Sequence, residues 1–279
     1  MVDLDLIVAG HCTQLERFTR RDGAWRPIEF PSLVAVIRHP NLGVVLFDTG
    51  YAPRFATATA RWPYRLYSLL LPVSCTPWDT VLTQLADRGI EPDHVRTIVL
   101  SHLHGDHVGG LRDFPSARIL LGAGALPAGW RDRSAWRNTA HGFVPALLPD
   151  DVERRVEYPA PDSVVCTGLG GVLDSGADPF GDGSVVTVPL PGHTDGHQGL
   201  WLPTEGPDGV LLVGDACWSE RAYTHGELPA GFILRSGDEQ SYRAVLADLT
   251  RLHRARPDLL IVPSHCWPSI RRAQAVLGG

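Results

Sequence analysis

The sequence lacks several residue types, and each absence excludes a class of chemistry. None of its 25 basic residues is a lysine, and its one methionine is Met1. A lysine-dependent phosphate loop, a pyridoxal-phosphate Schiff base and a lysine nucleophile or base are therefore excluded. The net charge is −6, and no basic stripe of the kind that nucleic-acid binders carry is present. We therefore expect no nucleic-acid partner.

Cysteine and long apolar runs are also scarce. Five scattered cysteines without a CxxC pair are typical of a protein from a reducing cytoplasm: Cys12, Cys75, Cys166, Cys217 and Cys266. The chain starts with acidic residues where a signal peptide would be basic. No apolar run approaches the length that crosses a membrane. We therefore expect a cytoplasmic protein without a membrane partner.

Hydrophobic patterning predicts a mixed fold of class α+β. Apolar runs bounded by turn residues predict strands over 4–8, 33–37, 44–47, 97–100, 118–121, 185–188, 199–202, 210–213 and 259–262. Helical periodicity predicts helices over 79–88, 238–254 and 268–277. Because the early strands follow one another directly and the helices come later, the order favours a sandwich over a strictly alternating parallel sheet.

Two stretches show no pattern clear enough to assign strands or helices throughout. Residues 122–182 are rich in Gly, Pro, Trp and Arg and show weak periodicity, so we expect an insertion of helical pieces and a long surface loop that forms a lid. Residues 51–77 are a second candidate for an active-site wall. Either stretch could equally be a packing element.

The segment 101–107 reads SHLHGDH and follows a predicted strand. In extended backbone His102 and His104 project to the same side, and Asp106 and His107 follow as the chain turns. Imidazole and carboxylate ligands suit Zn²⁺, and also Fe or Mn. A histidine-rich surface turn is the alternative, but the full HxHxDH pattern favours a metal site.

Three later segments repeat the pattern of a ligand type just after an apolar strand. They end in His193, Asp215 and His265. Because strand ends of one sheet lie close together, we expect these side chains to converge with the HxHxDH segment on one site.

Together these motifs resemble the metallo-β-lactamase-fold hydrolases. The resemblance rests on FDTG at 47–50, HxHxDH at 102–107, GHT at 192–194, GD at 214–215 and SH at 264–265. It implies an αββα sandwich with a dinuclear metal site between the sheet edges. Because the motifs span nearly the whole chain in family order, it also implies a single domain over 1–279.

The resemblance also implies a ligand set. His102, His104 and His193 would bind the first metal, and Asp215 would bridge to the second. The remaining ligands of the second metal would be Asp106, His107 and His265. All seven positions are filled, which favours two divalent ions, Zn²⁺ first and Fe or Mn as alternatives.

Other residues near these motifs have two interpretations each. Asp48 either hydrogen-bonds the metal-binding loop or caps its own turn, and His197 either contacts a ligand or is a satisfied core histidine. Trp218 stands where the most similar branch of the family carries a tyrosine, and Tyr223 is a candidate replacement. Cys217 and Cys266 are expected to pack as small apolar groups.

Within the superfamily the runs at 101–110, 191–198 and 214–216 look most like the N-acyl-homoserine lactonase-like, quorum-quenching branch. This resemblance implies a hydrolase whose metal-bridging hydroxide opens a small acyl-lactone, with Asp106 as the nearest proton carrier and a homodimer as a possible assembly. The alternatives are a thioester or ester hydrolase of glyoxalase II type, a mono-iron persulfide dioxygenase-like oxidoreductase and a non-catalytic sensor of acyl ligands.

Overall fold

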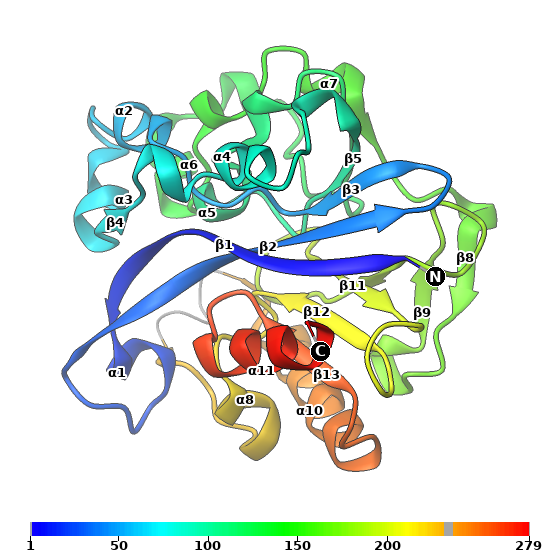
Figure 1. The fold of residues 1–279 in the computed structure, drawn as a ribbon. Helices are drawn as coiled ribbons and strands as arrows, with labels where there is room; N and C mark the ends of the chain where they lie inside the picture. The colour runs from blue at the N-terminus through cyan, green and yellow to red at the C-terminus, as the bar shows by residue number, and fades with distance from the viewer. Residues whose placement is uncertain (1, 232–236, 279) are drawn as a thin grey trace.

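The computed structural model describes residues 2–231 and 237–278. Within these residues the chain forms two β-sheets packed face to face, with helices on both outer faces (Figure 1). The first sheet has the strand order β4-β1-β2-β3-β5-β6-β7 and the second has the order β13-β12-β11-β10-β9-β8. The predicted α+β class and αββα sandwich are confirmed.

The strands of the first sheet are β1 (Asp3–Leu15), β2 (Pro27–His39), β3 (Gly43–Phe47), β4 (Val73–Ser74), β5 (Val95–Val99), β6 (Arg118–Leu120) and β7 (Val156–Glu157). Those of the second sheet are β8 (Val164–Cys166), β9 (Ser175–Ala177), β10 (Val186–Pro189), β11 (Gln198–Leu202), β12 (Val210–Gly214) and β13 (Leu260–Pro263).

The helices are α1 (Glu16–Thr19), α2 (Arg54–Ala58), α3 (Arg65–Leu70), α4 (Val81–Ala86), α5 (Gly105–Val108), α6 (Ala135–Ala140), α7 (Val152–Arg155), α8 (Glu220–His225), α10 (Glu239–Ala255) and α11 (Trp267–Leu277). The predicted helices at 79–88, 238–254 and 268–277 correspond to α4, α10 and α11.

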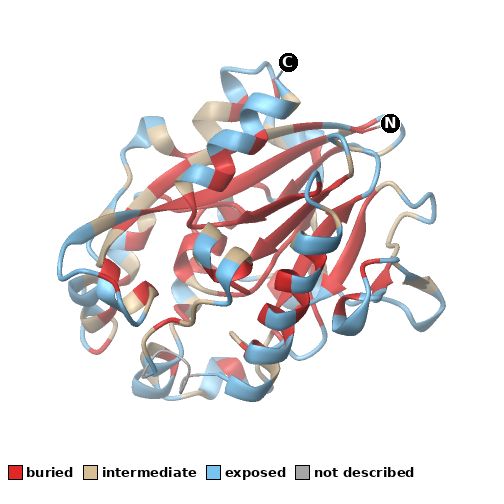
Figure 2. Ribbon diagram, turned by 90° about the horizontal axis from the view of Figure 1, so that it is seen from below, coloured by how far each residue is buried: buried red, intermediate tan, exposed pale blue. Residues whose placement is uncertain are grey.

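Strand β2 shows how the layers are built. Leu33 and Ile37 belong to the core between the sheets, whereas Val34 and Val36 belong to the core under α2 and α4. All four side chains are 1% exposed or less, so the strand is apolar throughout rather than alternating. Figure 2 shows the same contrast, with buried strands between helices that are exposed on one side.

The second sheet is covered by α8 and α10. The α10 residues Tyr242, Val245 and Leu249 recur at helical spacing and pack in one cluster with Leu211 and Ile261 of the sheet. Asp238 starts this helix by accepting hydrogen bonds from the backbone N–H groups of residues 240 and 241.

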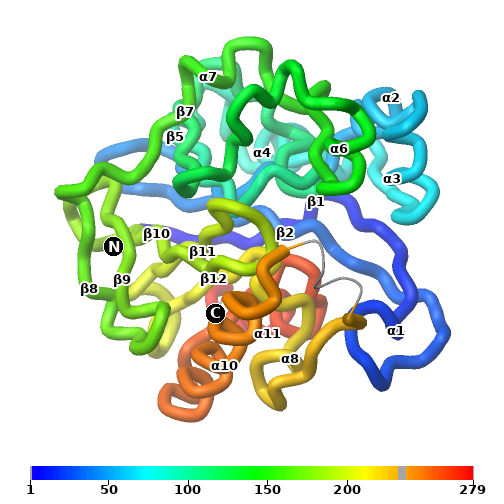
Figure 3. The backbone as a smooth tube through the Cα atoms, turned by 180° about the vertical axis from the view of Figure 1, so that it is seen from behind, coloured from blue at the N-terminus to red at the C-terminus, as the bar shows by residue number. Residues whose placement is uncertain are grey.

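Residues 122–182 combine short helices and short strands with irregular chain. They supply α6, α7 and β7 on the first sheet and then β8 and β9 on the second, so this segment is the crossing between the two sheets (Figure 3). The expected helical pieces are present here, and the role of this segment as a lid stays a prediction. Short strands separated by Gly and Pro give too little periodicity to be recognised.

Among the described residues no helix is both long and apolar enough to span a membrane.

Candidate metal centre

The candidate site lies where strands of both sheets end. His102 follows β5 of the first sheet, while His193, Asp215 and His265 follow β10, β12 and β13 of the second. The first sheet also supplies α5, which carries Asp106 and His107. The structure therefore brings together all seven side chains that the sequence analysis predicted to meet at one site.

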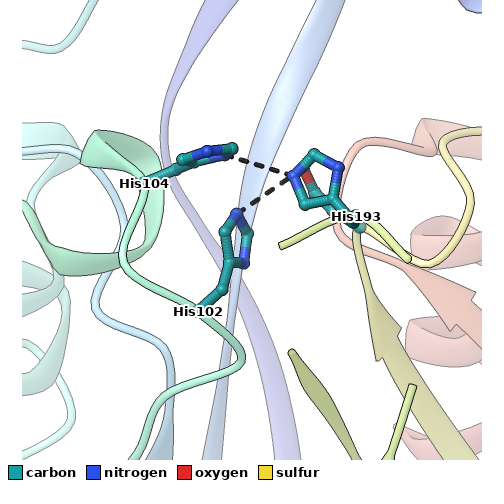
Figure 4. A group of neighbouring side chains, drawn as sticks. His102, His104 and His193 are labelled. Carbon is teal, nitrogen blue, oxygen red and sulfur yellow. Dashed lines mark hydrogen bonds and ion pairs between the residues drawn. The ribbon is translucent and has the colours of Figure 1, made fainter. Parts of the chain in front are cut away.

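The first group consists of His102, His104, His193 and Asp215. One ligand atom from each lies within 4.8 Å of the others. Nε2 of His193 is 3.2 Å from Nδ1 of His104 and 3.3 Å from Oδ2 of Asp215. Figure 4 shows the three imidazole rings pointing toward a common centre.

The second group consists of Asp106, His107 and His265, which meet the same 4.8 Å limit. Oδ2 of Asp106 is 3.3 Å from Nε2 of His265 and 3.6 Å from Nε2 of His107. Oδ1 of Asp215 is 3.0 Å from His265 Nε2 and 3.4 Å from His107 Nε2. Asp215 thus directs one carboxylate oxygen to each group.

Several buried ligand-type atoms in these groups lack a hydrogen bond of good geometry. They include Nε2 of His102, Nε2 of His107 and Oδ1 of Asp215. An unsatisfied buried polar atom costs about 1–3 kcal/mol, so three of them at one centre indicate a missing partner. Imidazole nitrogens and carboxylate oxygens within a few ångströms of one another fit divalent cations such as Zn²⁺.

Asp48 positions the first-sheet part of the site. Its carboxylate lies 2.7 Å from Nδ1 of His107 and accepts hydrogen bonds from the backbone N–H and the hydroxyl of Ser101 at 2.7 and 2.8 Å. The Ser101 hydroxyl is also 3.0 Å from Nδ1 of His102. The back nitrogens of both rings are engaged, so their Nε2 atoms face the centre.

Backbone carbonyls orient two more histidine rings of the site. The Pro31 carbonyl accepts from Nδ1 of His265 at 2.7 Å, and the His141 carbonyl accepts from Nε2 of His104 at 3.1 Å. His104 therefore presents Nδ1 to the centre, whereas His265 presents Nε2.

His197 fixes the backbone of Asp215. Its Nδ1 donates to the Leu190 carbonyl at 3.0 Å, and its Nε2 accepts the Asp215 backbone N–H at 3.0 Å. Burial lowers the pKa of His197 to about 4, which keeps the ring neutral and Nε2 an acceptor. A Cβ on Gly214 (φ 53°) would lie 2.9 Å from that Nε2, so this turn needs glycine.

The two groups differ in their electrostatics. In the first group burial lowers the pKa of His102 and His193 well below the ordinary value, so both rings are neutral and could act as ligands. In the second group burial alone would lower the pKa of His107, but the Asp48, Asp106 and Asp215 carboxylates outweigh it and hold this pKa well above the ordinary value. A cation bound there would take the place of a proton on His107.

A cavity of about 690 Å³ opens beside the second group, with His265 in its wall. Phe30 lies against both His265 and Trp218, with ring centroids 5.6 and 6.3 Å away, and Trp218 lies 5.9 Å from the His193 ring. Further apolar lining comes from Ile28, Trp267 and Pro268.

Tyr223 does not take the place of a tyrosine at the centre. Its hydroxyl accepts from Arg272 at 2.7 Å and lies 3.2 Å from the Ser269 hydroxyl, both on α11, while its side chain belongs to the core under α8 and α10. Trp218, three residues after Asp215, does line the cavity. Cys217 is a buried free thiol in the core under α8 and α10, as expected for a packing group. The buried Cys266 thiol instead accepts hydrogen bonds from the Glu220 backbone N–H and the Ser269 hydroxyl, both at 3.2 Å.

Sequence reasoning missed four contributors to the site. Ser101 stands next to the HxHxDH run, and its place beside His102 was the signal that could have identified it. Pro31, His141 and Phe30 come from distant segments and leave no local signal.

The fold and the site define an αββα protein with a two-part histidine and aspartate centre suited to divalent cations. Residues 27–265 match the family model described as the metallo-beta-lactamase superfamily. A "Probable metallo-hydrolase" of Mycobacterium tuberculosis is 32% identical over 235 residues, covering 80% of this chain and 71% of the relative. The chain belongs to the metallo-β-lactamase superfamily.

Named lactonases are also similar. An N-acyl homoserine lactonase, AttM, of Azorhizobium caulinodans is 28% identical over 250 residues, which cover 88% of this chain and 86% of the relative. A solved N-acyl homoserine lactone hydrolase with N-hexanoyl-L-homoserine at its catalytic metal centre superposes with a TM-score of 0.72. It is 20% identical, with 98% of this chain and 96% of the other covered.

Proposed function

We propose that this chain is a metal-dependent hydrolase that opens the lactone ring of an N-acyl-homoserine lactone or a similar acyl-lactone. The observation that carries the proposal is Asp215, which directs one oxygen to each of two neighbouring ligand groups. The likeness to the N-acyl homoserine lactonases of Azorhizobium and other bacteria supports the substrate class. We also propose that residues 1–279 work as one domain.

In this proposal His102, His104 and His193 hold one divalent cation and Asp106, His107 and His265 hold the other, with Asp215 shared. Zn²⁺ is the proposed ion, with Fe or Mn as alternatives. Such ions lower the pKa of water from 15.7 towards about 7 and polarise an ester carbonyl.

The protein's own groups supply position and proton transfer. Asp48, Ser101 and the Pro31 carbonyl hold the ligand rings by their far nitrogens. Asp106, whose Oδ2 lies 3.3 Å from His265, is the proposed carrier of the proton to the leaving alkoxide. Trp218 forms the wall beside His193 and is the proposed contact for the substrate's reacting end.

In this proposal the cavity beside His265 binds the acyl chain of the substrate. Ile28, Phe30, Trp218 and Trp267 form an apolar part of its wall, next to polar residues that include Glu29, Glu220 and Arg221. Its volume of about 690 Å³ accommodates an acyl chain along the apolar part. An acyl-lactone would place its ester at the ligand groups and its chain along these side chains.

The proposal is tested by a pH-indicator hydrolysis assay on metal-replete protein, with acyl-homoserine lactones of short and long chain and with simple aliphatic lactones. We expect acid release that a chelator abolishes. Asp215→Asn should lose bound metal, measured by elemental analysis, and lower kcat/KM at least about 100-fold. The exposed Asp162→Asn is the matched control.

The alternatives predict other outcomes. Hydrolysis of thioesters without any lactone turnover would replace the lactonase with an enzyme of glyoxalase II type. One bound iron and no hydrolysis would favour the persulfide dioxygenase-like reaction. Unchanged metal content and activity in Asp215→Asn would overturn the whole assignment.

A further inference from the structure

Helices α3 and α6, together with the turn before α3, carry four large exposed apolar side chains. Trp62, Leu69, Leu70 and Trp136 are 60, 59, 68 and 62% exposed. Figures 1 and 3 both place the two helices side by side, and the amide of Asn138 on α6 donates to the hydroxyl of Tyr64 at the start of α3. We call this set, together with the exposed Arg61, Arg65 and Arg137, the Trp62 face.

The Trp62 face is positively charged in a negatively charged protein. The whole chain has 31 acidic residues among 279, yet residues 49–78 and 133–149 contain none. Among the described residues, Arg61, Arg65 and Arg137 form no ion pair with a carboxylate. Within 49–78 the remaining arginine, Arg54, is paired with Asp113. These two stretches therefore combine unpaired positive charge with exposed apolar side chains and contain no carboxylate.

The geometry of α3 mixes the two kinds of side chain. Arg65 and Leu69 are four residues apart and lie on the side opposite the buried Tyr67. Exposed tryptophans and leucines between arginines are typical of surfaces that enter the interface of an anionic membrane, where the indole lies at headgroup level and the arginines are attracted to the lipid charge.

A second copy of the chain fits the Trp62 face less well than an anionic membrane does. A two-fold dimer through this face would place the same patch against itself, and so bring two copies of Arg61, Arg65 and Arg137 into one interface. Like charges without a carboxylate between them oppose such an interface. An anionic lipid surface, by contrast, complements both the charge and the apolar groups.

We propose that the Trp62 face is a peripheral docking surface for anionic lipid bilayers. This proposal stands independently of the proposed lactonase activity and revises the expectation of no membrane partner, which rested on the lack of a spanning segment. The face adjoins the site: α6 ends at Ala140, and the carbonyl of the next residue, His141, accepts from the His104 ring. Docking would bring the centre close to a bilayer in which an amphiphilic substrate dissolves.

The test is flotation of the metal-replete protein with vesicles of phosphatidylcholine alone and of phosphatidylcholine with phosphatidylglycerol. We expect binding to the anionic vesicles only, and weaker binding as salt is raised. Arg61→Glu/Arg65→Glu and, separately, Trp62→Ser/Leu69→Ser should each weaken binding at least about tenfold. The matched control Arg96→Glu/Arg154→Glu changes the charge equally on β5 and α7, and Trp25→Ser removes an equally exposed indole.

Three outcomes would overturn the proposal. They are no binding to either kind of vesicle, equal losses in the control variants, and vesicle binding unaffected by the Trp62-face substitutions. Light scattering on the same proteins tests whether a second copy of the chain occupies the face instead. If Arg61→Glu/Arg65→Glu changes a dimer but has no effect on vesicle binding, the face is a contact between copies. Thermal unfolding of each variant identifies a loss caused by misfolding.

Discussion

Asp48 shows how one residue can support a whole site. It has a φ of 62° and is the only residue other than glycine with positive φ in the described part of the chain. Such a conformation is uncommon and costs about 1–2 kcal/mol for most side chains, less for Asp and Asn. Here it directs a fully buried carboxylate at Ser101 and His107.

Asp48→Asn should test whether the Asp48 carboxylate positions the His107 ring without being needed for folding. Asparagine tolerates the same backbone conformation, so the variant should fold. Its amide presents an N–H₂ donor or a weaker acceptor to His107, so the affinity for the second cation should fall about 10–100-fold. Competition with a chromogenic chelator measures this affinity, and the exposed Asp174→Asn serves as the control. An unchanged affinity would show that Asp48 only caps its turn.

At the scale of elements, the connection between β1 and β2 forms one wall of the cavity. Glu16 anchors it by accepting from Arg26 at 2.8 Å, Arg20 at 3.1 Å and the Ala24 backbone N–H at 3.3 Å. The hydrogen bond from Arg26 lowers the pKa of Glu16 from 4.5 to about 2, against a smaller effect of burial. Thr19 of the same connection lines the cavity.

Glu16→Gln should lower the free energy of unfolding at neutral pH by about 1 kcal/mol. The value is modest because the Arg26 side chain is 68% exposed and solvent screens the pair. A depressed folded-state pKa stabilises the protein above pH 4.5, and this contribution is lost as the pH falls through about 2. Urea unfolding at several pH values should therefore show the two proteins converging in acid. If the difference in the free energy of unfolding between the two proteins grew in acid, it would contradict the assignment of an ionised Glu16.

Strand β2 also lines the cavity and gives a second prediction at the scale of elements. This prediction rests on the proposed function. Ile28 is half-buried and lines the cavity. Ile28→Ser should raise KM for a decanoyl lactone about tenfold and for a butanoyl lactone less than about twofold, because only a long chain loses the apolar contact. Val164→Ser removes an exposed apolar side chain elsewhere and should change neither value. Equal effects on both substrates would place the acyl chain outside this cavity.

At the scale of the whole molecule, the centre joins the two sheets. The first sheet contributes His102 and α5, and the second contributes His193, Asp215 and His265. Cations bound here would link the layers in addition to the core between them, and a ligand bound only by the folded state stabilises it.

Metal removal should therefore lower the unfolding temperature of the whole protein. With a chelator we expect Tm to fall by about 5–10 °C, and to recover when Zn²⁺ is added back. Differential scanning calorimetry measures the shift. Asp215→Asn should bind less metal at the start, so the chelator should lower its Tm by less than that of the wild-type protein. A Tm indifferent to chelator in the wild-type protein would show that no structural cation is held.

The sequence by itself determined the class of fold and which residues meet, because these depend on local patterns. Apolar runs ending in His102, Asp215 or His265 place ligand types at strand ends, and strand ends converge in any such sandwich. The periodicity of α10 was equally readable, since its apolar face repeats within one segment.

Only the tertiary structure decided how these side chains are held. Pro31 orients His265 across 234 residues of sequence, and His141 selects the ring nitrogen that His104 presents. The crossing at 122–182 and the inward turn of the Tyr223 hydroxyl depend in the same way on distant partners. A local pattern records whether a side chain is apolar and how often it recurs, but a hydrogen bond between remote segments exists only once the two sheets have packed.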